Sequence, residues 1–364
     1  MGNLKYDDGP SLDRITHNNE SSCKTMKNKE LSGASSESVS VIAPARLHLG
    51  FLDMHGGLGR QFGSLGLCLS NIYTHLTAKK SDDIVIHGPS SQRGTEYVSR
   101  IFNALKIAGG VDITIHEEIP EHAGLGSGTQ LSLAIGMAIS RLYGSQKSVR
   151  EVAALMKRGA RSGIGIGGFS MGGFLVDGGR GESTEIPPIV SHSYFPEEWR
   201  VLLVFDKNVE GINGDPEKQI FNELLPMTEE VSGKICRLVL MQVLPALAEK
   251  NCVDFGSAIT EIQTMVGEHF SEAQQGHYSS QQVAAIMHWL LDHGATGIGQ
   301  SSWGPTGFAI YPNELEAYSA LQSVRKKWHE EKNLDFCLCT ARNRMADVII
   351  DGQLPQDTNL QSYQ

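Results

Sequence analysis

Apolar positions alternate with polar ones in some stretches of this chain and recur at helical spacing in others. Between Val111 and Ile119 the apolar residues alternate, which predicts a strand. Between Thr95 and Ala108 they recur every three or four residues, which predicts an amphipathic helix. The stretch Leu131–Tyr143 is rich in apolar and small residues and predicts a second helix. A strand, a glycine-rich loop at 120–130 and a helix therefore follow one another.

The same patterns place elements along the rest of the chain. Strands are predicted at 38–43, 84–86, 169–177, 199–205, 306–311 and 336–342. Helices are predicted at 148–161, 216–225, 229–248, 254–270, 280–293 and 314–327. Ser148 followed by Glu151 has the spacing of a capping box, which gives the first of these helices a defined start. The glycine-rich stretches 48–66 and 294–305 are predicted to be loops.

Prolines interrupt these patterns between residues 185 and 196. Because proline cannot continue a helix or a central strand, we predict a domain boundary there. The N-terminal domain would span residues 38–190 and the C-terminal domain residues 191–352. Residues 1–37 are polar and poor in large apolar side chains, which predicts a disordered tail, and residues 353–364 are predicted to form a polar C-terminal tail.

Composition is that of an ordinary globular protein, because 40% of the 364 residues are hydrophobic and 20% are charged. The net charge of −10 is spread along the chain, which argues against nucleic acid as a partner. We find no signal-peptide pattern and no run of the ~18 apolar residues that a membrane helix needs. We therefore expect a cytoplasmic protein without a membrane partner. A homodimer is expected because two-fold dimers are the commonest symmetric assemblies.

The loop at 120–130 reads Pro-Glu-His-Ala-Gly-Leu-Gly-Ser-Gly-Thr-Gln. Glycines let a backbone approach an anion closely. The free N–H groups and the dipole at a helix start also favour negative charge. The run therefore predicts a phosphate-binding loop made of Gly124, Leu125, Gly126, Ser127, Gly128 and Thr129. A tight turn without a ligand is the alternative.

Two further glycine-rich clusters accompany this loop. One reads APARLHLGFLD from residue 43 and runs on to Gly66, and the other reads GQSSWGPTG from residue 299. Three such clusters in this order resemble the GHMP kinases, named after galactokinase, homoserine kinase, mevalonate kinase and phosphomevalonate kinase. The resemblance covers about residues 38–350. It implies an α+β, two-domain fold with an S5-domain-2-like N-terminal domain and a ferredoxin-like C-terminal domain.

The chain departs from the kinase pattern in two places. Gly128 and Thr129 stand where the kinases carry Ser-Ala. The stretch Arg158–Phe169, which corresponds to a kinase stretch with a catalytic Asp, contains no carboxylate. Its two arginines and Ser162 suit an anionic substrate better than the deprotonation of an alcohol. An ATP-dependent small-molecule kinase is therefore kept as the competing function.

Four local patterns are closer to one branch of the superfamily, the β-ribofuranosylaminobenzene 5′-phosphate synthases. They are ARLHLGFLD, AGLGSGTQ, RxxRSGIG and GQSSWGPTGF. This resemblance implies a decarboxylating pentosyl transfer from phosphoribosyl pyrophosphate to 4-aminobenzoate. The reaction releases CO2 and pyrophosphate and begins tetrahydromethanopterin synthesis. A phosphosugar-binding relative without catalysis is a second competitor.

The resemblance also assigns roles to residues. The loop Gly124–Thr129 would hold the pyrophosphate together with Mg2+, which prefers phosphates plus one or two carboxylates. Asp53 would supply such a carboxylate, and a turn-capping Asp is the alternative for it. The predicted catalytic residues are Arg46, His48 and Asp53.

Arginine side chains are the candidate anion clamps, because their planar fork suits phosphate and carboxylate groups. These candidates are Arg46, Arg60, Arg158 and Arg161. The last two stand three residues apart at the end of a predicted helix, where cations also stabilise the helix C-terminus. Ser162 follows them and is assigned to substrate binding with them.

His48 stands two residues after Arg46 and would lie on the same face of a strand. It is assigned as a proton donor or hydrogen-bond partner, and a structural histidine is the alternative. Ser301, Ser302 and Trp303 would close the substrate site from the second domain. Trp303 would either stack on an aromatic ring or pack in the core.

Overall fold

The computed structural model describes residues 37–211, 219–220, 223–274, 276–302 and 304–353. The strands are β1 (Ser38–Asp53), β2 (Arg60–Ser81), β3 (Ile84–His87), β4 (Gly110–Glu117), β5 (Phe174–Asp177), β6 (Arg180–Gly181), β7 (Ile189–Ser193), β8 (Arg200–Asp206), β9 (Gly297–Gln300), β10 (Gly307–Tyr311), β11 (Leu334–Cys339) and β12 (Asp347–Ile350). The helices are α1 (Ser91–Leu105), α2 (Ser127–Leu142), α3 (Val149–Leu155), α4 (Ile164–Met171), α6 (Glu229–Leu238), the π-helical η1 (Val239–Val243), α7 (Leu244–Ala248), α8 (Cys252–Gln274), α9 (Gln281–Asp292) and α10 (Glu314–Lys327). The two predicted tails and most of the predicted helix 216–225 lie outside the described residues.

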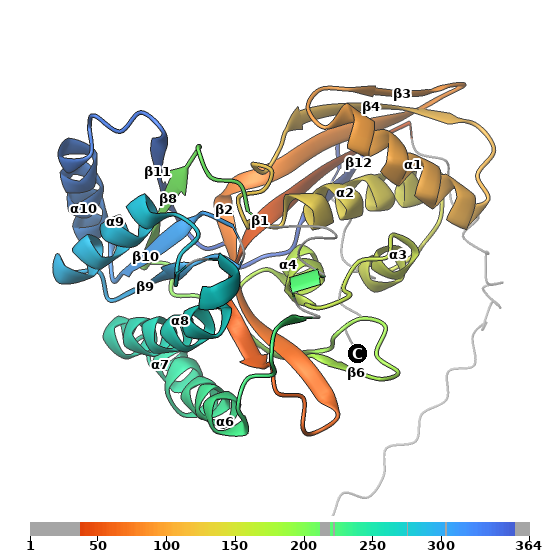
Figure 1. Ribbon diagram of the computed structural model, residues 1–364. Helices are drawn as coiled ribbons and strands as arrows, with labels where there is room; N and C mark the ends of the chain where they lie inside the picture. The colour runs from red at the N-terminus through yellow and green to blue at the C-terminus, as the bar shows by residue number, and fades with distance from the viewer. Residues whose placement is uncertain (1–36, 212–218, 221–222, 275, 303, 354–364) are drawn as a thin grey trace, which may run out of the picture. The chain divides into compact units, whose positions relative to one another are not determined.

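The first sheet is built around the long antiparallel pair β1 and β2 (Figure 1). Its strand order is β12-β1-β2-β4-β3, with β5 and β6 also paired to β2 and β7 paired to β5. The pairing of β3 with β4 is parallel, and the other pairings are antiparallel. One face of this sheet packs against α1 and α2, because the inward positions of the strands are apolar.

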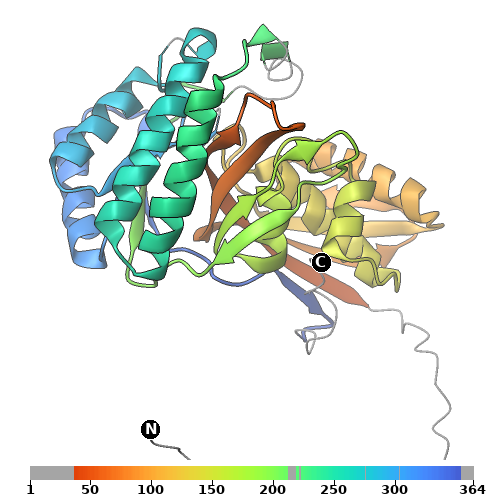
Figure 2. The same cartoon turned by 90° about the horizontal axis from the view of Figure 1, so that it is seen from below.

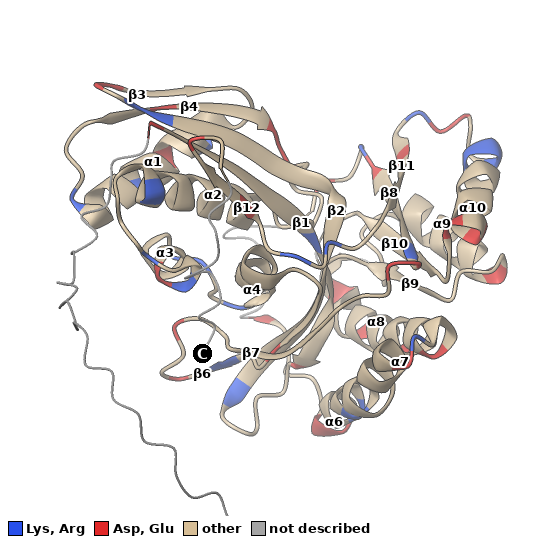
Figure 3. Ribbon diagram, turned by 180° about the vertical axis from the view of Figure 1, so that it is seen from behind, with Lys and Arg blue, Asp and Glu red and all other residues tan. Residues whose placement is uncertain are grey.

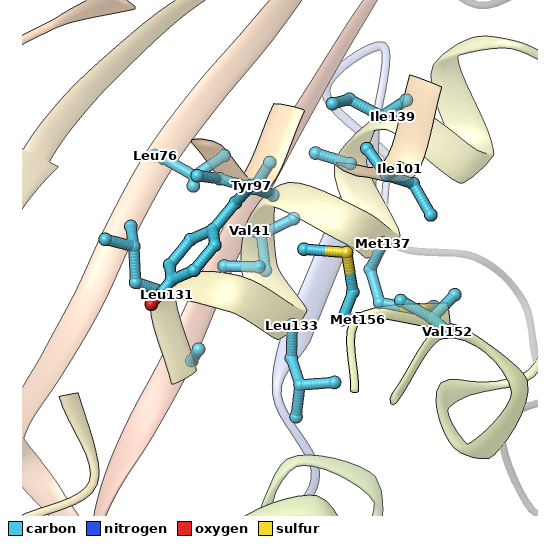
Figure 4. Packing of buried hydrophobic residues seen from close by; sticks show 14 of the residues in the cluster. Val41, Leu76, Tyr97, Ile101, Leu131, Leu133, Met137, Ile139, Val152 and Met156 are labelled. Atoms are coloured by element: carbon cyan, nitrogen blue, oxygen red, sulfur yellow. The ribbon is translucent and has the colours of Figure 1, made fainter. Parts of the chain in front are cut away.

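Helix α2 is the central helix of this half and is buried on almost all sides. It contacts β1 and β2 on one side and α1, α3 and α4 on the others. Figure 4 shows the resulting core, in which Met137 of α2 lies among Val41 and Leu76 from the sheet and Ile101 and Met156 from other helical segments. A helix that is apolar all round is stable only inside a core. The glycine-rich loop before α2 is therefore attached to a rigid element.

The second sheet has the strand order β11-β8-β10-β9 and is antiparallel throughout. Helices α9 and α10 cover one of its faces, and α8 lies against the other. In chain order the strands are β8, β9, β10 and β11, so the sheet has the 4-1-3-2 order of a ferredoxin-like domain. The predicted α+β architecture with a ferredoxin-like C-terminal half is confirmed.

An aromatic cluster joins the two sheets. The ring of Phe255 on α8 lies 5.6 Å from the ring of Phe174 on β5 and 5.3 Å from that of Trp199, which precedes β8. Phe195 completes the cluster at 5.6 Å from Phe255. The surrounding core contains residues of β1, β2, β8, β10 and the helices α6 to α8. The two sheets therefore share one apolar core.

Several element boundaries differ from the sequence prediction. The predicted loop 48–66 is mostly strand, because β1 runs to Asp53 and β2 begins at Arg60. The predicted strand 169–177 consists of the end of α4 followed by β5. The predicted loop 294–305 contains β9. In the two predicted loops glycines were taken as loop formers, whereas here they lie in paired strands.

The predicted capping box is confirmed, since Ser148 Oγ accepts from the Glu151 amide at 3.2 Å and Glu151 accepts from the Ser148 amide at 2.8 Å. The helix it starts is shorter than predicted and ends at Leu155. Strand β7 crosses the predicted boundary at 190/191. Strand β12, which the sequence analysis did not predict, returns from the second half to pair with β1. The first sheet is thus formed by two separate segments of the chain, whereas the four strands of the second sheet follow one another in sequence.

The helical stretch Glu229–Ala248 lies beside α8, as Figure 2 shows from below. By length and composition alone this stretch could cross a membrane, since an 18-residue window of it has a mean hydropathy of 1.4. The expectation that no segment is long and apolar enough for a membrane helix is therefore wrong. One such helix is weak support for a membrane span, because helices of soluble proteins pass the same test. Four of its buried apolar residues recur at every fourth position and pack into the shared core; they are Ile235, Val239, Val243 and Leu247.

We predict that Phe255→Ala lowers the free energy of unfolding by about 3–5 kcal/mol, because it removes a fully buried ring from the cluster that joins the sheets. Val253→Ala, two residues earlier on the same helix, is the matched control, since Val253 is 63% exposed. It should change the free energy by less than about 0.5 kcal/mol. Urea denaturation of both variants measures the difference, and equal losses would contradict the shared core.

Candidate functional site

The glycine-rich loop connects β4 to the N-terminus of α2. Leu125 is completely buried and anchors the loop in the shared core. Gly124 and Gly126 have φ angles of 78° and 85°, a left-handed conformation that favours glycine. Gly124, Gly126 and Gly128 are partly exposed. The first amides of α2 have no partner within the helix, so they and the helix dipole are available to an anion.

The loop at 301–306 is hydrogen-bonded to this phosphate loop. Ser301 Oγ donates to the Gly124 carbonyl at 2.8 Å, and Thr306 Oγ1 donates to the Ala123 carbonyl at 2.7 Å. Gly304 packs directly on Gly124, where an added Cβ atom would lie 2.9 Å from the Gly304 Cα. The second half of the chain therefore fixes the shape of the phosphate loop.

Ser301 also accepts a hydrogen bond from the His48 amide at 3.0 Å and is fully buried. Its hydroxyl is thus occupied by backbone groups of β1 and of the phosphate loop. Ser301 thus has a positioning contact, and its substrate-binding role stays a prediction. Ser302 continues the same loop with a φ of 56°, and its amide donates to the His48 carbonyl at 3.3 Å. Trp303 lies outside the described residues.

Arg46 lies against the phosphate loop, as predicted. Its amide donates to the Leu125 carbonyl at 3.1 Å, and its Nη1 donates to the Gly124 carbonyl at 2.5 Å. A Cβ atom added to Gly126 would lie 3.4 Å from the guanidinium carbon of Arg46. A positive charge therefore stands beside the amide groups at the start of α2, and both favour the same anion.

Arg158 and Arg161 lie between α3 and α4. Helix α3 ends at Leu155, and the Arg158 amide donates to the Ala153 carbonyl of its last turn at 2.8 Å, so the helix-end alternative remains for Arg158. The Arg158 guanidinium carbon is 5.0 Å from the centre of the Tyr97 ring, a cation–π distance. The hydroxyl of Tyr97 is the nearest atom, at 3.7 Å, to a Cβ added at Gly128. Tyr97, which the sequence analysis did not single out, thus connects Arg158 to the start of α2.

His48 follows Arg46 on the same face of β1 and is 2% exposed. Burial, together with the nearby charges of Arg46 and Arg161, lowers the pKa of His48 to about 3. The imidazole is therefore neutral at physiological pH, and its role as a proton donor stays a prediction. Its Nε2 has no hydrogen-bond partner among the described residues. The hydrogen-bond role stays a prediction.

Asp53 and Arg60 lie at the other end of β1, away from the phosphate loop. Asp53 Oδ1 accepts from the amides of His55 and Gly56 at 2.7 and 3.0 Å, which is a turn-capping arrangement. Seven residues of strand separate Asp53 from Arg46, or roughly 20 Å. Arg60 donates to the carbonyls of two glycines in the β5–β6 turn, both at 2.9 Å. The structure does not bring these two side chains to the phosphate loop.

Ser162 has a local structural role. Its hydroxyl donates to Asp177 Oδ2 at 3.1 Å and accepts from the Ile164 amide at 3.2 Å. The fold thus brings a carboxylate next to the stretch 158–169, which has none of its own. Asp177 is occupied by Ser162 and by the amides of Gly163 and Gly179 at 2.8 and 2.9 Å. Burial raises the pKa of Asp177, which these hydrogen bonds partly offset.

The residues do not form a protein-held metal centre at the phosphate loop. Within the described part of the chain, no three His, Cys, Asp or Glu side chains gather to hold an ion. Asp53, the predicted Mg2+ ligand, is distant and already caps a turn. Figure 3 shows lysine and arginine interspersed with acidic residues over the visible elements. Positive charge near the loop therefore comes from Arg46, Arg158 and Arg161.

We predict that Gly124→Ala destabilises the protein by at least ~2 kcal/mol, because the new Cβ would meet the Ser301 carbonyl oxygen at 2.2 Å and φ is left-handed. Gly128→Ala is the matched control, since its Cβ would meet nothing closer than 3.7 Å. Alanine also favours a helix over glycine, so this variant should lose no stability. Thermal unfolding of both measures the effect, and an unaffected Gly124→Ala would disprove the close contact.

We also predict that the free energy of unfolding falls as the pH drops below about 6.5, which is the pKa of histidine in the unfolded chain. The fall continues towards pH 3, because the pKa of His48 in the folded protein is about 3. In this window the unfolded chain binds the proton and the folded one does not. Between pH 7 and pH 5 the loss from His48 is about 2 kcal/mol. His48→Gln should reduce the pH dependence of urea denaturation by that amount. The exposed-site control His329→Gln should leave the dependence as in the wild type.

Comparison with known proteins identifies the fold. Residues 96–173 match the family described as GHMP kinases N terminal domain, and residues 243–330 match GHMP kinases C terminal. Galactokinase from Lactococcus lactis, complexed with galactose, aligns with a TM-score of 0.65 at 12% identity, over 87% of this chain and 96% of that one. A mevalonate kinase structure aligns with a TM-score of 0.60 at 15% identity, over 84% and 99%. At these identities the likeness concerns the fold alone.

Relatives found by sequence share a higher identity with this chain than these structures do. The β-ribofuranosylphenol 5′-phosphate synthase of Methanocaldococcus jannaschii is 35% identical over 302 residues, which are 75% of this chain and 89% of that protein. The synthase of the same name from Archaeoglobus fulgidus is 34% identical over 318 residues, covering 84% and 97%. These matches confirm the synthase branch that the four motifs predict. The chain belongs to the β-ribofuranosylphenol 5′-phosphate synthase family, on the fold of the GHMP kinases.

Proposed function

We propose that this protein is an enzyme that transfers a phosphoribosyl group from phosphoribosyl pyrophosphate to a 4-substituted benzoate, releasing CO2 and pyrophosphate. The product is a β-ribofuranosyl aryl 5′-phosphate, which would serve tetrahydromethanopterin synthesis. The proposal rests on the family and on one observation above all, the position of Arg46 on the glycine loop at the start of α2. That arrangement suits the diphosphate of the donor.

The bond changes balance without an oxidant or a protein nucleophile. The bond between ribose C1 and the pyrophosphate oxygen breaks, and the leaving group takes the electron pair. The ring carbon that bears the carboxylate forms a bond to C1. The carboxylate then leaves as CO2, and its electron pair restores the aromatic ring. The protein contributes position and charge complementarity.

Charge complementarity would come from the start of α2 and from the arginines. The amides of the glycine loop and Arg46 would stabilise the negative charge that develops on the leaving pyrophosphate. Arg158 and Arg161 would bind other anionic groups of the two substrates. Mg2+ would enter with the pyrophosphate, since phosphates and water supply most of its ligands. No protein carboxylate is assigned to the ion.

The acceptor is either 4-aminobenzoate or 4-hydroxybenzoate. The motif resemblance implies an aminobenzene product, whereas the names of the archaeal relatives give a phenol. The two acceptors differ only in the group para to the carboxylate, and both groups donate electrons to the carbon that attacks. We propose 4-aminobenzoate first and treat 4-hydroxybenzoate as the alternative that a direct assay distinguishes.

A kinase is the competing function, and Asp177 is a carboxylate that the fold brings beside the stretch where kinases carry a catalytic Asp. Its oxygens accept hydrogen bonds from Ser162, Gly163 and Gly179, and the side chain is buried. A carboxylate occupied in this way is a poor base for a substrate hydroxyl. This observation favours ribosyl transfer over phosphoryl transfer.

We predict that the purified protein, with phosphoribosyl pyrophosphate and Mg2+, releases labelled CO2 from one of two carboxyl-labelled acceptors, 4-aminobenzoate or 4-hydroxybenzoate. One pyrophosphate should appear for each CO2. Formation of ADP from ATP and an alcohol, without CO2 release, would instead identify a kinase.

The contribution of Arg46 is tested in the same assay. Arg46→Lys should lower kcat/KM for phosphoribosyl pyrophosphate at least ~10-fold, because a lysine cannot reproduce the planar contact with the loop. Arg200→Lys is the matched control, because Arg200 bonds Glu314 and nearby carbonyls of the second sheet. It should retain the wild-type value. Full activity of Arg46→Lys would remove Arg46 from pyrophosphate binding.

A further inference from the structure

The side chain of Arg158 is half-buried, yet it forms no hydrogen bond or ion pair within the described part of the chain. Its Nε is buried without a partner. Other shielded arginines are paired with carboxylates; Arg93 contacts Glu118, for example, and Arg342 lies 3.0 Å from Asp347. A buried guanidinium nitrogen without a partner costs free energy, which an anionic ligand can recover.

The ring of Tyr97 holds this guanidinium in place. The Arg158 guanidinium carbon lies 5.0 Å from the centre of the ring. Tyr97 belongs to α1 and is only 6% exposed, so the core fixes the orientation of its ring. A cation–π contact uses the face of the ring and none of the N–H donors of the guanidinium. The donors of Arg158 therefore remain available to an anion.

The hydroxyl of Tyr97 is a second polar group of this cluster that has no partner. It takes part in no hydrogen bond within the described residues. It is the atom nearest to a Cβ added at Gly128, at 3.7 Å. Figure 4 shows its oxygen at the margin of the core, on the side of Leu131. A nearly buried side chain thus directs a free O–H donor to the start of α2.

The start of α2 therefore has donors for anions at two separate positions. Arg46 lies beside Gly126, where an added Cβ would be 3.4 Å from its guanidinium carbon. Tyr97 lies beside Gly128, and Arg158 lies over the Tyr97 ring. Two residues of helix separate the Cα atoms of the two glycines by roughly 5–6 Å. This spacing is comparable with one sugar ring that carries a phosphate group at either end.

We propose that Arg158 and the Tyr97 hydroxyl bind the 5′-phosphate of phosphoribosyl pyrophosphate, while Arg46 and the glycine-rich loop bind its pyrophosphate. This inference rests on the proposed ribosyl transfer and names the residues that recognise the other end of its donor. The planar guanidinium suits two phosphate oxygens, and the hydroxyl can donate to a third. The ribose then lies across the start of α2, with C1 towards Arg46.

The 5′-phosphate suits Arg158 better than the carboxylate of the acceptor does. That carboxylate leaves as CO2, so an arginine bound to it would stabilise the substrate and lose the contact as CO2 forms. The barrier to decarboxylation would rise. The 5′-phosphate keeps its charge from substrate to product and takes no part in the bond changes. Strong binding there positions ribose C1 without opposing the reaction.

Arg158→Gln tests the contact by titration calorimetry. Ribose 5-phosphate should bind at least 10-fold more weakly than to the wild type, whereas pyrophosphate with Mg2+ should keep its affinity within two-fold. Lys157→Gln is the matched control, because it removes the same charge from the neighbouring exposed position. It should leave both affinities within two-fold of the wild type. Wild-type affinity of Arg158→Gln for ribose 5-phosphate would overturn the proposal, and so would an equal loss for both ligands.

Two conservative variants test the geometry and decide the question if Arg158→Gln does not fold. Arg158→Lys keeps the charge without the planar fork, so ribose 5-phosphate should bind at least three-fold more weakly than to the wild type. Tyr97→Phe keeps the ring and removes only the hydroxyl, and the same loss of at least three-fold is expected. Pyrophosphate affinity should stay within two-fold in both. Wild-type affinity for ribose 5-phosphate in both variants would overturn the site.

The binding experiment is independent of turnover. Arg158-dependent binding of ribose 5-phosphate, together with no CO2 release by the wild type, would refute the proposed function and leave the phosphate site in place. CO2 release by the wild type, together with unchanged ribose 5-phosphate binding in Arg158→Gln, would do the reverse. The two failures are therefore distinguishable.

Discussion

The hydrogen bonds between the phosphate loop and the loop 301–306 are the constraint on which the site depends. Ser301 connects the carbonyl of Gly124 to the amide of His48, and the backbones of Gly124 and Gly304 are in direct contact. Three segments that are far apart in the sequence thus meet at one serine. Because the hydroxyl is fully buried, both of its bonds form in a low dielectric, where an unmade bond is costly.

This connection bears on the choice between the proposed ribosyl transfer and a kinase reaction. The start of α2 supplies amides for a diphosphate in either case, since that property belongs to any helix N-terminus. The groups around it differ. Arg46, Arg158 and Arg161 supply charge, whereas Asp177 is occupied by backbone amides and a serine. A reaction whose leaving group is a diphosphate, and which needs no base, matches this set of groups.

The sequence by itself determined the phosphate loop, most helices and the family, because spacing and motifs are local properties. It also placed Arg46 and His48 on one strand face. Tertiary structure decided the rest. Asp53 and Arg60 hydrogen-bond in turns away from the glycine-rich loop, and Ser301 and Ser162 have structural partners. Asp177 lies beside the stretch 158–169. Burial keeps His48 neutral. These outcomes depend on long-range pairing and burial, which set the partners and the dielectric around a side chain and leave no mark in local sequence.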